Sequence, residues 1–343
     1  MVSVDRAASG TRPPTLAELP PPPPGLTGWP WTEGTAPLPS AGPNGQPWPR
    51  LSIVTPSYNQ AEFVEATIRS VLLQGYPNLE YLVVDGGSTD GSVEIIERYA
   101  PWLSYWVSEP DRGQSHAINK GLARCTGEVF NWVNSDDLLA PGALAEVARL
   151  WSSTRAALLV GRGLIVDVTS GQLRHDWPGR PPREPLDFVR SDRVVLAQPS
   201  TFLDTGLVKA QGGLREDLHC VLDWELYLRL TVRLRDRLNV ATTRALLSTA
   251  AYHPASKTSQ QQEAFHAEGL RVLREIGRHL PHFERLRMAA AVRAIVTQDL
   301  VAEVWTAQHR WRYLTRLLLQ RPDALWSRPY WGAMHRLLVG TAL

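Results

Sequence analysis

The chain has few cysteines, and no membrane or export segment is visible in it. Its two cysteines, Cys125 and Cys220, lie outside any CxxC or Cys/His cluster. This argues against a structural zinc site or a disulfide framework and favours a reducing compartment. No run of about 18 apolar residues predicts a membrane-spanning helix, and no apolar signal segment follows Met1. We therefore expect a soluble, cytoplasmic protein.

Common nucleotide-binding motifs are also missing. Neither GxGxxG nor GxxxxGK[ST] occurs, so the signatures of dinucleotide-dependent dehydrogenases and of P-loop enzymes are lacking. The charge is nearly balanced, with 36 Lys+Arg against 34 Asp+Glu. Without a recognisable binding motif, that balance gives little support for a nucleic-acid partner.

The charge is distributed unevenly along the 343 residues. Residues 263–343 contain 12 Arg, no Lys and 7 Asp+Glu, a net charge of +5, and the whole chain has +2, which leaves −3 for residues 1–262. A mildly acidic body with a basic tail indicates a division of labour between the two.

The N-terminal segment has an unusual composition. Residues 1–49 hold 13 of the 27 prolines, including the run Pro20–Pro24. Because proline lacks a backbone N–H group, this composition predicts an extended or disordered leader. Its tryptophans could still dock on the main body, namely Trp29, Trp31 and Trp48.

From Leu51 onward, apolar β-branched runs alternate with segments of helical periodicity. Strands are predicted at residues 51–55, 80–84, 105–107, 129–133, 158–168, 194–203 and 239–252. Helices are predicted at 63–72, 93–99, 116–124, 223–233, 288–305, 311–319 and 331–338. The alternation predicts an α/β fold with a mostly parallel sheet, whose ligands bind beyond the carboxyl ends of the strands.

Two polar turns after these strands carry acidic residues. Asp136 and Asp137, with Asn134 before them, lie where carboxylates can hold Mg²⁺ or Mn²⁺ together with substrate phosphates. Asp85, in the segment DGGSTD, can accept a hydrogen bond from a base or a ribose, and its glycines allow close backbone approach. Each motif alone is also typical of a turn that caps a helix.

Together, five motifs in register resemble family 2 of the nucleotide-sugar glycosyltransferases, which have the GT-A fold. They are IVTPSYN at 53–59, YLVVDGGSTDGS at 81–92, EPDRGQSHAINKG at 109–121, GE at 127–128, and NSDD at 134–137 before PGAL. The resemblance implies a Rossmann-like, mostly parallel mixed sheet flanked by helices. It further implies a Pro-rich leader at 1–49, a catalytic domain at 50–262 with a nucleotide-sugar-binding half (50–145) and an acceptor-side half (146–262), and a helical C-terminal extension at 263–343.

The resemblance also implies roles for individual residues on the donor side. Those that would contact the nucleotide or the donor sugar are Thr55, Pro56, Tyr58, Asp85, Gly86, Asp111, Arg112, Ser115, Asn119, Asn134, Ser135 and Asp136. Asp136 would be the main metal ligand of the DxD element, in which Asn134 stands at the first position and Asp137 could compensate. His253, in a late segment that can fold over the diphosphate, would be a further ligand, and Lys257 could pair with phosphate.

On the acceptor side, the segment Leu222-Asp223-Trp224-Glu225 resembles the family's ED motif. Asp223 matches the base that takes a proton from the acceptor hydroxyl, with Glu225 as the alternative base and Trp224 beside them. By itself, Asp223 is equally a carboxylate favoured by a helix N-terminus. Gly212 and Gly213 resemble a turn that brings the backbone close to both substrates.

The resemblance thus implies an inverting, hexosyl-type glycosyltransferase that uses Mg²⁺ or Mn²⁺ and a nucleotide-diphosphate sugar. Its acceptor would be a glycan, a lipid-linked sugar or a small molecule, as in the biosynthesis of cell-surface polysaccharides or glycolipids, with no nucleic acid as partner. Two alternatives stay open: a nucleotidyltransferase, and a catalytically silent module that binds sugar nucleotides or lipids. The Arg- and Trp-rich C-terminal helices could contact the inner face of a membrane, join a second copy, or pack on the catalytic domain.

Overall fold

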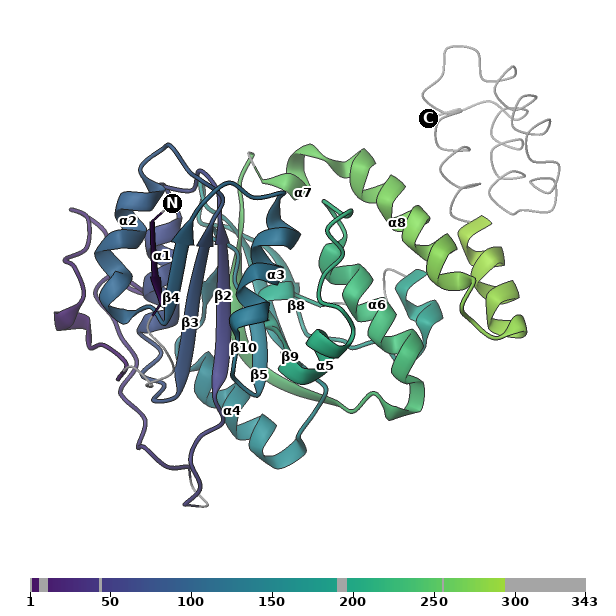
Figure 1. Cartoon of the computed structure of the whole chain (residues 1–343), viewed down its shortest axis with the longest axis horizontal. Helices are drawn as coiled ribbons and strands as arrows, with labels where there is room; N and C mark the ends of the chain where they lie inside the picture. Colours follow the sequence, from purple (N-terminus) through teal and green to yellow (C-terminus); the bar gives the residue numbers. More distant parts are fainter. Residues whose placement is uncertain (1, 6–11, 43–44, 190–195, 255, 294–343) are drawn as a thin grey trace, which may run out of the picture. The chain divides into compact units, whose positions relative to one another are not determined.

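Strands and helices alternate between residues 51 and 139 as the sequence predicts (Figure 1). The computed structural model describes residues 2–5, 12–42, 45–189, 196–254 and 256–293. The elements of this part are β2 (Leu51–Ser57), α1 (Val64–Leu72), β3 (Leu79–Asp85), α2 (Ser92–Tyr99), β4 (Tyr105–Ser108), α3 (Gln114–Arg124), β5 (Val129–Trp132) and β6 (Leu138–Leu139). Each strand and helix predicted up to residue 133 is confirmed.

Residues 143–277 add further helices and strands. They are α4 (Ala143–Thr154), β7 (Leu158–Asp167), β8 (Leu173–Trp177), β9 (Thr201–Asp204), α5 (Thr205–Ala210), α6 (Leu222–Leu234), β10 (Val240–Tyr252), α7 (Lys257–Gln260) and α8 (Gln262–Gly277). The strand predicted at 194–203 is shorter than expected, because Gln198–Ser200 form a 3-10 turn that leads into β9. At the other end of the chain, β1 (Val2–Asp5) pairs with β4.

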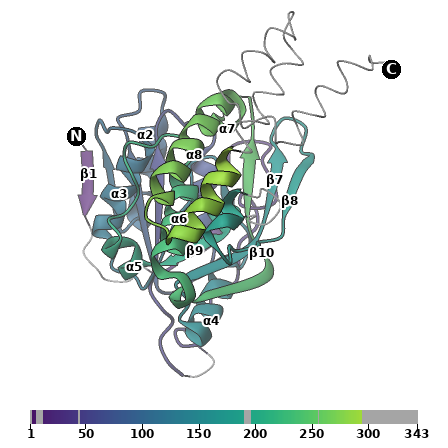
Figure 2. The same cartoon turned by 90° about the vertical axis from the view of Figure 1, so that its right-hand side faces the viewer.

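In the part of the chain that the structure describes, the strands form one mixed sheet in the order β1-β4-β3-β2-β5-β9-β7-β10-β6, with β8 paired to β7. β2 is parallel to β3 and β5, and β3 is parallel to β4, so the carboxyl ends of these four strands meet at one edge. β9 runs antiparallel to both neighbours, and β7 and β10 are again parallel (Figure 2). The mostly parallel mixed sheet flanked by helices is confirmed.

Helices cover both faces of this sheet. Successive residues of a strand point to opposite sides, and in β2 the residues of both sides are buried. Ile53 of β2 belongs to the buried cluster that also contains Ile68 of α1 and Val147 of α4. The next residue, Val54, faces α3 on the opposite side. A Cβ atom built on Gly121 of α3 would lie only 2.6 Å from Val54 Cγ1, so this glycine lets the helix approach the sheet closely.

The Pro-rich leader differs from the disordered segment that its composition predicts. Its described residues lie against the catalytic domain, and Leu19 and Trp48 are buried in the main hydrophobic cluster. Trp29 Nε1 donates a hydrogen bond of 2.9 Å to the carbonyl of Leu139. The expected docking of these two tryptophans is therefore confirmed, but the expectation of disorder is wrong for this part of the leader.

Arg69 of α1 supplies the hydrogen-bond donors that prolines lack. Its guanidinium is 0% exposed and donates to the carbonyls of Pro20, Pro30 and Trp31 at 2.8, 3.0 and 3.0 Å. It also donates to the hydroxyl of Tyr99 at 3.1 Å. Because a guanidinium has five N–H groups in a rigid fork, it can bind several carbonyls at once. The composition of the leader does not reveal this donor, because Arg69 comes from α1 and not from the leader.

By its contacts, the chain divides into two units, Met1–Glu268 and Gly269–Leu343, with the boundary inside α8. The helices predicted at 311–319 and 331–338, and most of the one at 288–305, lie outside the described residues. Among the helices that are described, none is both long and apolar enough to cross a membrane.

Replacement of Arg69 tests how the leader is held. We expect Arg69→Met to lower the free energy of unfolding by about 3–5 kcal/mol, because three buried carbonyls lose their donor at once. It should also open the leader to proteases. Urea unfolding and limited proteolysis measure the two effects. The control is Arg98→Met, since Arg98 is half exposed and forms a single ion pair with Glu65, so its loss should cost less than about 1 kcal/mol. Equal losses for the two variants would contradict the assignment.

Candidate functional site

Three turns that follow neighbouring strands meet at the carboxyl edge of the sheet. Tyr58 follows β2, Gly86 follows β3 and Asp111 follows β4. A Cβ atom built on Gly86 would lie 2.9 Å from Asp111 Oδ2 and 3.2 Å from Tyr58 Cδ2. The ring of Tyr58 is 61% exposed. The edge therefore presents an aromatic surface beside a carboxylate, and both were assigned to the donor from the sequence.

Asp85 shapes the turn at the end of β3. Its buried carboxylate accepts hydrogen bonds from the backbone N–H groups of Gly87 and Ser88, at 3.0 and 2.8 Å. The hydroxyls of Ser88 and Ser108 donate to it at 2.5 and 2.7 Å. Four donors thus fix both oxygens within the protein. In this state Asp85 orders the turn, where the sequence analysis expected it to accept from a base.

Thr55 and Pro56 belong to β2 and are buried in it. Thr55 Oγ1 shares a hydrogen bond of 2.9 Å with the hydroxyl of Tyr81 on β3, and Pro56 is paired with Val84. Both residues therefore join the strands behind the turn, and of Thr55, Pro56 and Tyr58 only Tyr58, which follows β2, is exposed.

The loop before α3 reaches across to the acceptor-side half. Asp111 Oδ1 accepts a hydrogen bond of 2.7 Å from the N–H of Gly113. Arg112, whose side chain is 69% exposed, forms an ion pair with Glu216. Because an exposed ion pair contributes little stability, an anionic ligand can displace Glu216 from Arg112.

Ser115 and Asn119 of α3 bind the same acceptor-side loop. Ser115 Oγ donates to the carbonyl of Leu218 at 3.3 Å. The amide of Asn119 pairs with the backbone of Leu214, donating to its carbonyl at 2.8 Å and accepting from its N–H at 2.9 Å. The sequence analysis placed both residues at the donor, whereas the structure uses these side chains to fasten α3 to the acceptor-side loop.

A chain of hydrogen bonds joins the start of α3 to the acidic turn after β5. Lys257 Nζ donates to Gln114 Oε1 at 2.8 Å, and Gln114 Nε2 donates to Asn134 Oδ1 at 2.7 Å. Asn134 Nδ2 in turn donates to Asp137 Oδ2 at 3.0 Å. Burial lowers the pKa of Lys257, while nearby acidic groups, Asp136 among them, oppose that shift. Asn134 therefore orients the acidic turn through both ends of its amide.

Asp136 and His253 are brought together from distant parts of the chain. Asp136 Oδ2 lies 3.2 Å from Nε2 of His253, and the carboxylate is 24% exposed. The imidazole of His253 is itself buried and stacks on Phe63, with ring centroids 4.8 Å apart. A carboxylate oxygen and an imidazole nitrogen at this separation are donors that suit Mn²⁺, and Mg²⁺ binds through few carboxylates and substrate phosphates.

Asp137 and Ser135, the neighbours of Asp136, are buried. Asp137 accepts from Asn134 and, through Oδ1, from the N–H of Ala251 at 3.2 Å. Burial and the charge of Asp136 raise the pKa of Asp137 well above its usual range. Across the described residues, no three His, Cys, Asp or Glu side chains gather as a metal-binding group. Asp137 thus supports the turn, while Asp136 and His253 place a carboxylate oxygen and an imidazole nitrogen close together.

Asp223 lies in the first turn of α6, and no cationic side chain pairs with it among the residues that the structure describes. Burial raises the pKa of Asp223, and its charge contributes to the raised pKa of Tyr227. The next residue, Trp224, packs edge-on against Phe188, with ring centroids 5.7 Å apart. Among the described residues this carboxylate therefore has backbone hydrogen bonds but no cationic partner, and an aromatic residue follows it in the chain.

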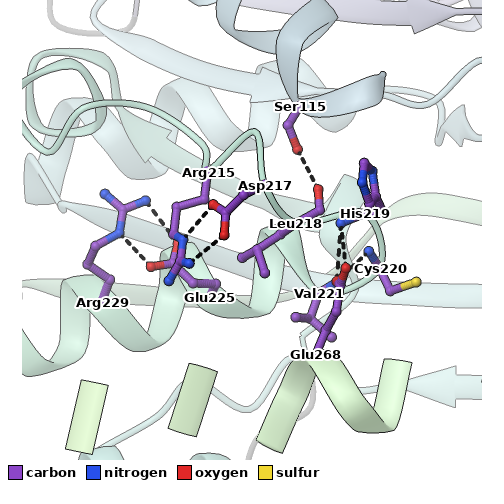
Figure 3. Close-up of polar contacts among 10 residues, drawn as sticks. All are labelled: Ser115, Arg215, Asp217, Leu218, His219, Cys220, Val221, Glu225, Arg229 and Glu268. Atoms are coloured by element: carbon purple, nitrogen blue, oxygen red, sulfur yellow. Dashed lines mark hydrogen bonds and ion pairs between the residues drawn. The ribbon is translucent and has the colours of Figure 1, made fainter. Parts of the chain in front are cut away.

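Glu225 is buried and is fully used inside the protein. Its two oxygens accept from Arg229 at 2.9 and 3.0 Å, and Arg229 donates to the carbonyls of Gln211 and Gly213 at 2.5 and 2.7 Å (Figure 3). Gly213 has a φ of +70°, a conformation that suits glycine. Glu225 therefore holds the turn that contains Gly212 and Gly213, which argues against its role as the alternative base.

Neither Gln114 nor Gln198 is assigned a role from the sequence, yet both contact the acidic turn. Gln198 Nε2 donates to the carbonyl of Trp132 at 2.8 Å and to Asn131 Oδ1 at 3.2 Å. Both glutamines orient the acidic turn through hydrogen bonds to Asn134. Gln114 lies inside the motif at 109–121 and Gln198 lies outside the five motifs, and neither position reveals a hydrogen-bond partner far along the chain.

Comparison with known proteins points to one family. A family model described as glycosyl transferase family 2 matches residues 52–203. An uncharacterized glycosyltransferase of Mycobacterium tuberculosis is 32% identical over 184 residues, which are 53% of this chain and 68% of that protein. TuaG of Bacillus subtilis, a glycosyltransferase assigned to teichuronic acid biosynthesis, is 37% identical over 92 residues, 26% of this chain and 36% of that protein.

Solved structures agree in fold. A crystal structure of S. aureus TarS 1-349 superposes with a TM-score of 0.57 and 17% identity, covering 85% of this chain and 92% of that one. The same protein in complex with UDP-GlcNAc gives a TM-score of 0.54 and 19% identity, with 70% of each chain covered. The motifs, the mixed sheet and these similarities together show that the chain belongs to glycosyl transferase family 2 and has the GT-A fold.

Proposed function

We propose that this glycosyltransferase moves a sugar from a nucleotide diphosphate to an acceptor hydroxyl, with inversion at the anomeric carbon and with help from Mg²⁺ or Mn²⁺. The observation that carries the proposal is the pair of Asp136 and His253, 3.2 Å apart. A metal ion needs such a pair close to the diphosphate, and Asp136 follows β5, at the edge where GT-A sheets bind their donors.

The residues present fit a divalent cation. Asp136 and His253 would hold it, and the diphosphate would supply further oxygens. When bound, the cation would neutralise the negative charge that develops on the leaving diphosphate. Lys257, whose ammonium lies near Asp136 and Asp111, and the exposed guanidinium of Arg112 would add positive charge on the donor side.

The nucleotide would bind where the three turns meet. The exposed ring of Tyr58 offers a face for the base, and Gly86 keeps the edge open for the ribose and the phosphates. The complex of TarS with UDP-GlcNAc supports a nucleotide sugar as the donor, since that protein shares the fold. TuaG, which is 37% identical over 92 residues, supports a cell-surface polysaccharide as the acceptor class.

Asp223 would act as the base. An inverting displacement requires a carboxylate beside the acceptor hydroxyl, on the face of the sugar opposite the leaving group. The raised pKa of Asp223 makes its carboxylate more basic than that of an exposed aspartate. No cation among the described residues neutralises it, so the carboxylate is available for the proton of the hydroxyl. Trp224 would pack against the acceptor sugar.

Loss of Asp136 should abolish both transfer and metal-dependent nucleotide binding. We expect Asp136→Ala to bind a nucleoside diphosphate equally weakly with and without Mn²⁺, because one of two protein ligands is gone. Isothermal titration measures this directly. The matched control is Asp176→Ala. It removes an exposed carboxylate of β8 that is paired with Arg162 of β7, and it should leave metal-dependent binding unchanged. Metal-dependent binding at full strength in Asp136→Ala would exclude Asp136 as a ligand.

Replacement of Asp223 should separate catalysis from donor binding. We expect Asp223→Asn to lower kcat about a thousandfold, the usual contribution of a general base, and to leave the Kd for the nucleotide sugar unchanged. In the wild type, kcat should fall at acidic pH, because protonation of Asp223 removes the base, and its raised pKa places that loss above the usual aspartate range. Asp236→Asn, which alters an exposed carboxylate beyond the other end of α6, serves as control. A weakened donor Kd in Asp223→Asn would make Asp223 a binding residue.

A further inference from the structure

We propose that Glu268 is a positioning residue for this reaction: its carboxylate fixes the loop of His219, Cys220 and Val221, and thereby sets the direction in which Asp223 points. This inference rests on the proposed role of Asp223 as the base. Glu268 lies on α8, far along the chain from the ED-type motif, and touches none of the reacting groups that the proposed function invokes.

The carboxylate lies among three consecutive backbone N–H groups (Figure 3). His219 donates to Oε1 and Oε2 at 3.0 and 3.1 Å. Cys220 and Val221 donate to Oε2 at 2.8 and 3.3 Å. These residues precede α6, where N–H groups have no partner within the helix and where the helix dipole favours negative charge. Of the three donors only Val221 is at the N-cap of α6, so Glu268 fixes the residues that lead into the helix.

An ionised carboxylate suits this place better than any neutral side chain. Burial raises the pKa of Glu268, but the hydrogen bonds from the N–H groups of Cys220, His219 and Val221 outweigh this effect. The pKa of Glu268 is therefore below its usual value. Hydrogen bonds to a charged acceptor are roughly twice as strong as neutral ones. Glu268 therefore stays ionised at neutral pH and keeps all its donors.

Two other side chains hold the beginning of this loop but not its end. Asn119 fastens Leu214 and Ser115 fastens Leu218, both from α3. Beyond Leu218, the contacts to Glu268 hold the chain up to Val221, whose carbonyl accepts the first bond of the α6 turn from Glu225 at 2.8 Å. The dihedral angles of these residues decide where the α6 helix starts, and so where the side chain of Asp223 points.

The same loop offers a built-in reporter. Cys220 and Cys125 are the two cysteines of the chain, and both thiols are buried. Burial raises the pKa of Cys220, and it raises that of Cys125 to about 12. Both thiols should therefore react slowly with a disulfide reagent in the folded protein. Release of the loop would expose Cys220, whereas Cys125 would react only if the domain unfolded.

The experiment compares three variants of the full chain: Glu268→Ala, Glu268→Gln and the control Glu263→Ala, which removes an exposed carboxylate from the same helix. Turnover, donor Kd and the rate of thiol modification are measured for each, with the modified cysteine identified by mass spectrometry. We expect Glu268→Ala to lower kcat about 10- to 100-fold, the scale of a small misplacement of a catalytic group, with donor Kd unchanged. Cys220 should react at least tenfold faster and Cys125 at its wild-type rate. Glu268→Gln keeps one acceptor oxygen and should lie in between.

Several outcomes would overturn the inference. An unchanged thiol rate in Glu268→Ala would show that the carboxylate does not hold the loop. Faster reaction of Cys220 with unchanged kcat would show that the loop does not position the base. Equal acceleration of both cysteines in Glu268→Ala would indicate that this variant unfolds. The milder variant Glu268→Gln would then be the test, and an unchanged rate of Cys220 in it would contradict the inference. If Asp223→Asn were fully active, the proposed base would be wrong, and the thiol rate would still report separately on the contact of Glu268.

Discussion

The parallel pairing of β2 with β3 and β5, and of β3 with β4, is the constraint on which the rest of the site depends. Because these strands run in one direction, every turn after them emerges at the same edge of the sheet. Tyr58, Gly86, Asp111 and Asp136 follow different strands and are gathered there without any local sequence relation. Glycine at position 86 is part of the same constraint, because a side chain would push two of the turns apart.

Several side chains of α3 that the family resemblance assigns to substrates bind other parts of the protein instead. Ser115 and Asn119 bind the loop that leads toward α6. Gln114 binds the acidic turn and Lys257 at once. α3 therefore connects the acidic turn after β5 with the loop at residues 214–218. A family motif can conserve a chemical pattern on a helix for this structural reason as readily as for contact with a ligand.

Much of the fold could be predicted from the sequence, since β-branched runs and polar turns alternate regularly from Leu51 onward. The resemblance, rather than the spacing of residues, also predicted that Asp136 and His253 lie close together. Hydrogen-bond partners were not predicted. The roles of Thr55, Asp85 and Glu225 depend on which groups face them after folding. The order of the leader depends on Arg69, whose place in a predicted helix does not reveal its hydrogen-bond partners.

Four carboxylates near the site show why residue type alone could not assign the roles. Asp85 receives four donors and orders a turn. Asp137 is buried against Asn134 and Ala251, and its raised pKa follows from that burial and from Asp136. Asp136 faces an imidazole and remains partly exposed, and Asp223, which is half-buried, has no cationic partner among the described residues. A satisfied carboxylate stabilises the fold, whereas one left with unused basicity or an open coordination position retains free energy that a substrate or a metal can use. We therefore propose Asp136 and Asp223, the two that folding leaves least satisfied, as the groups that carry the chemistry.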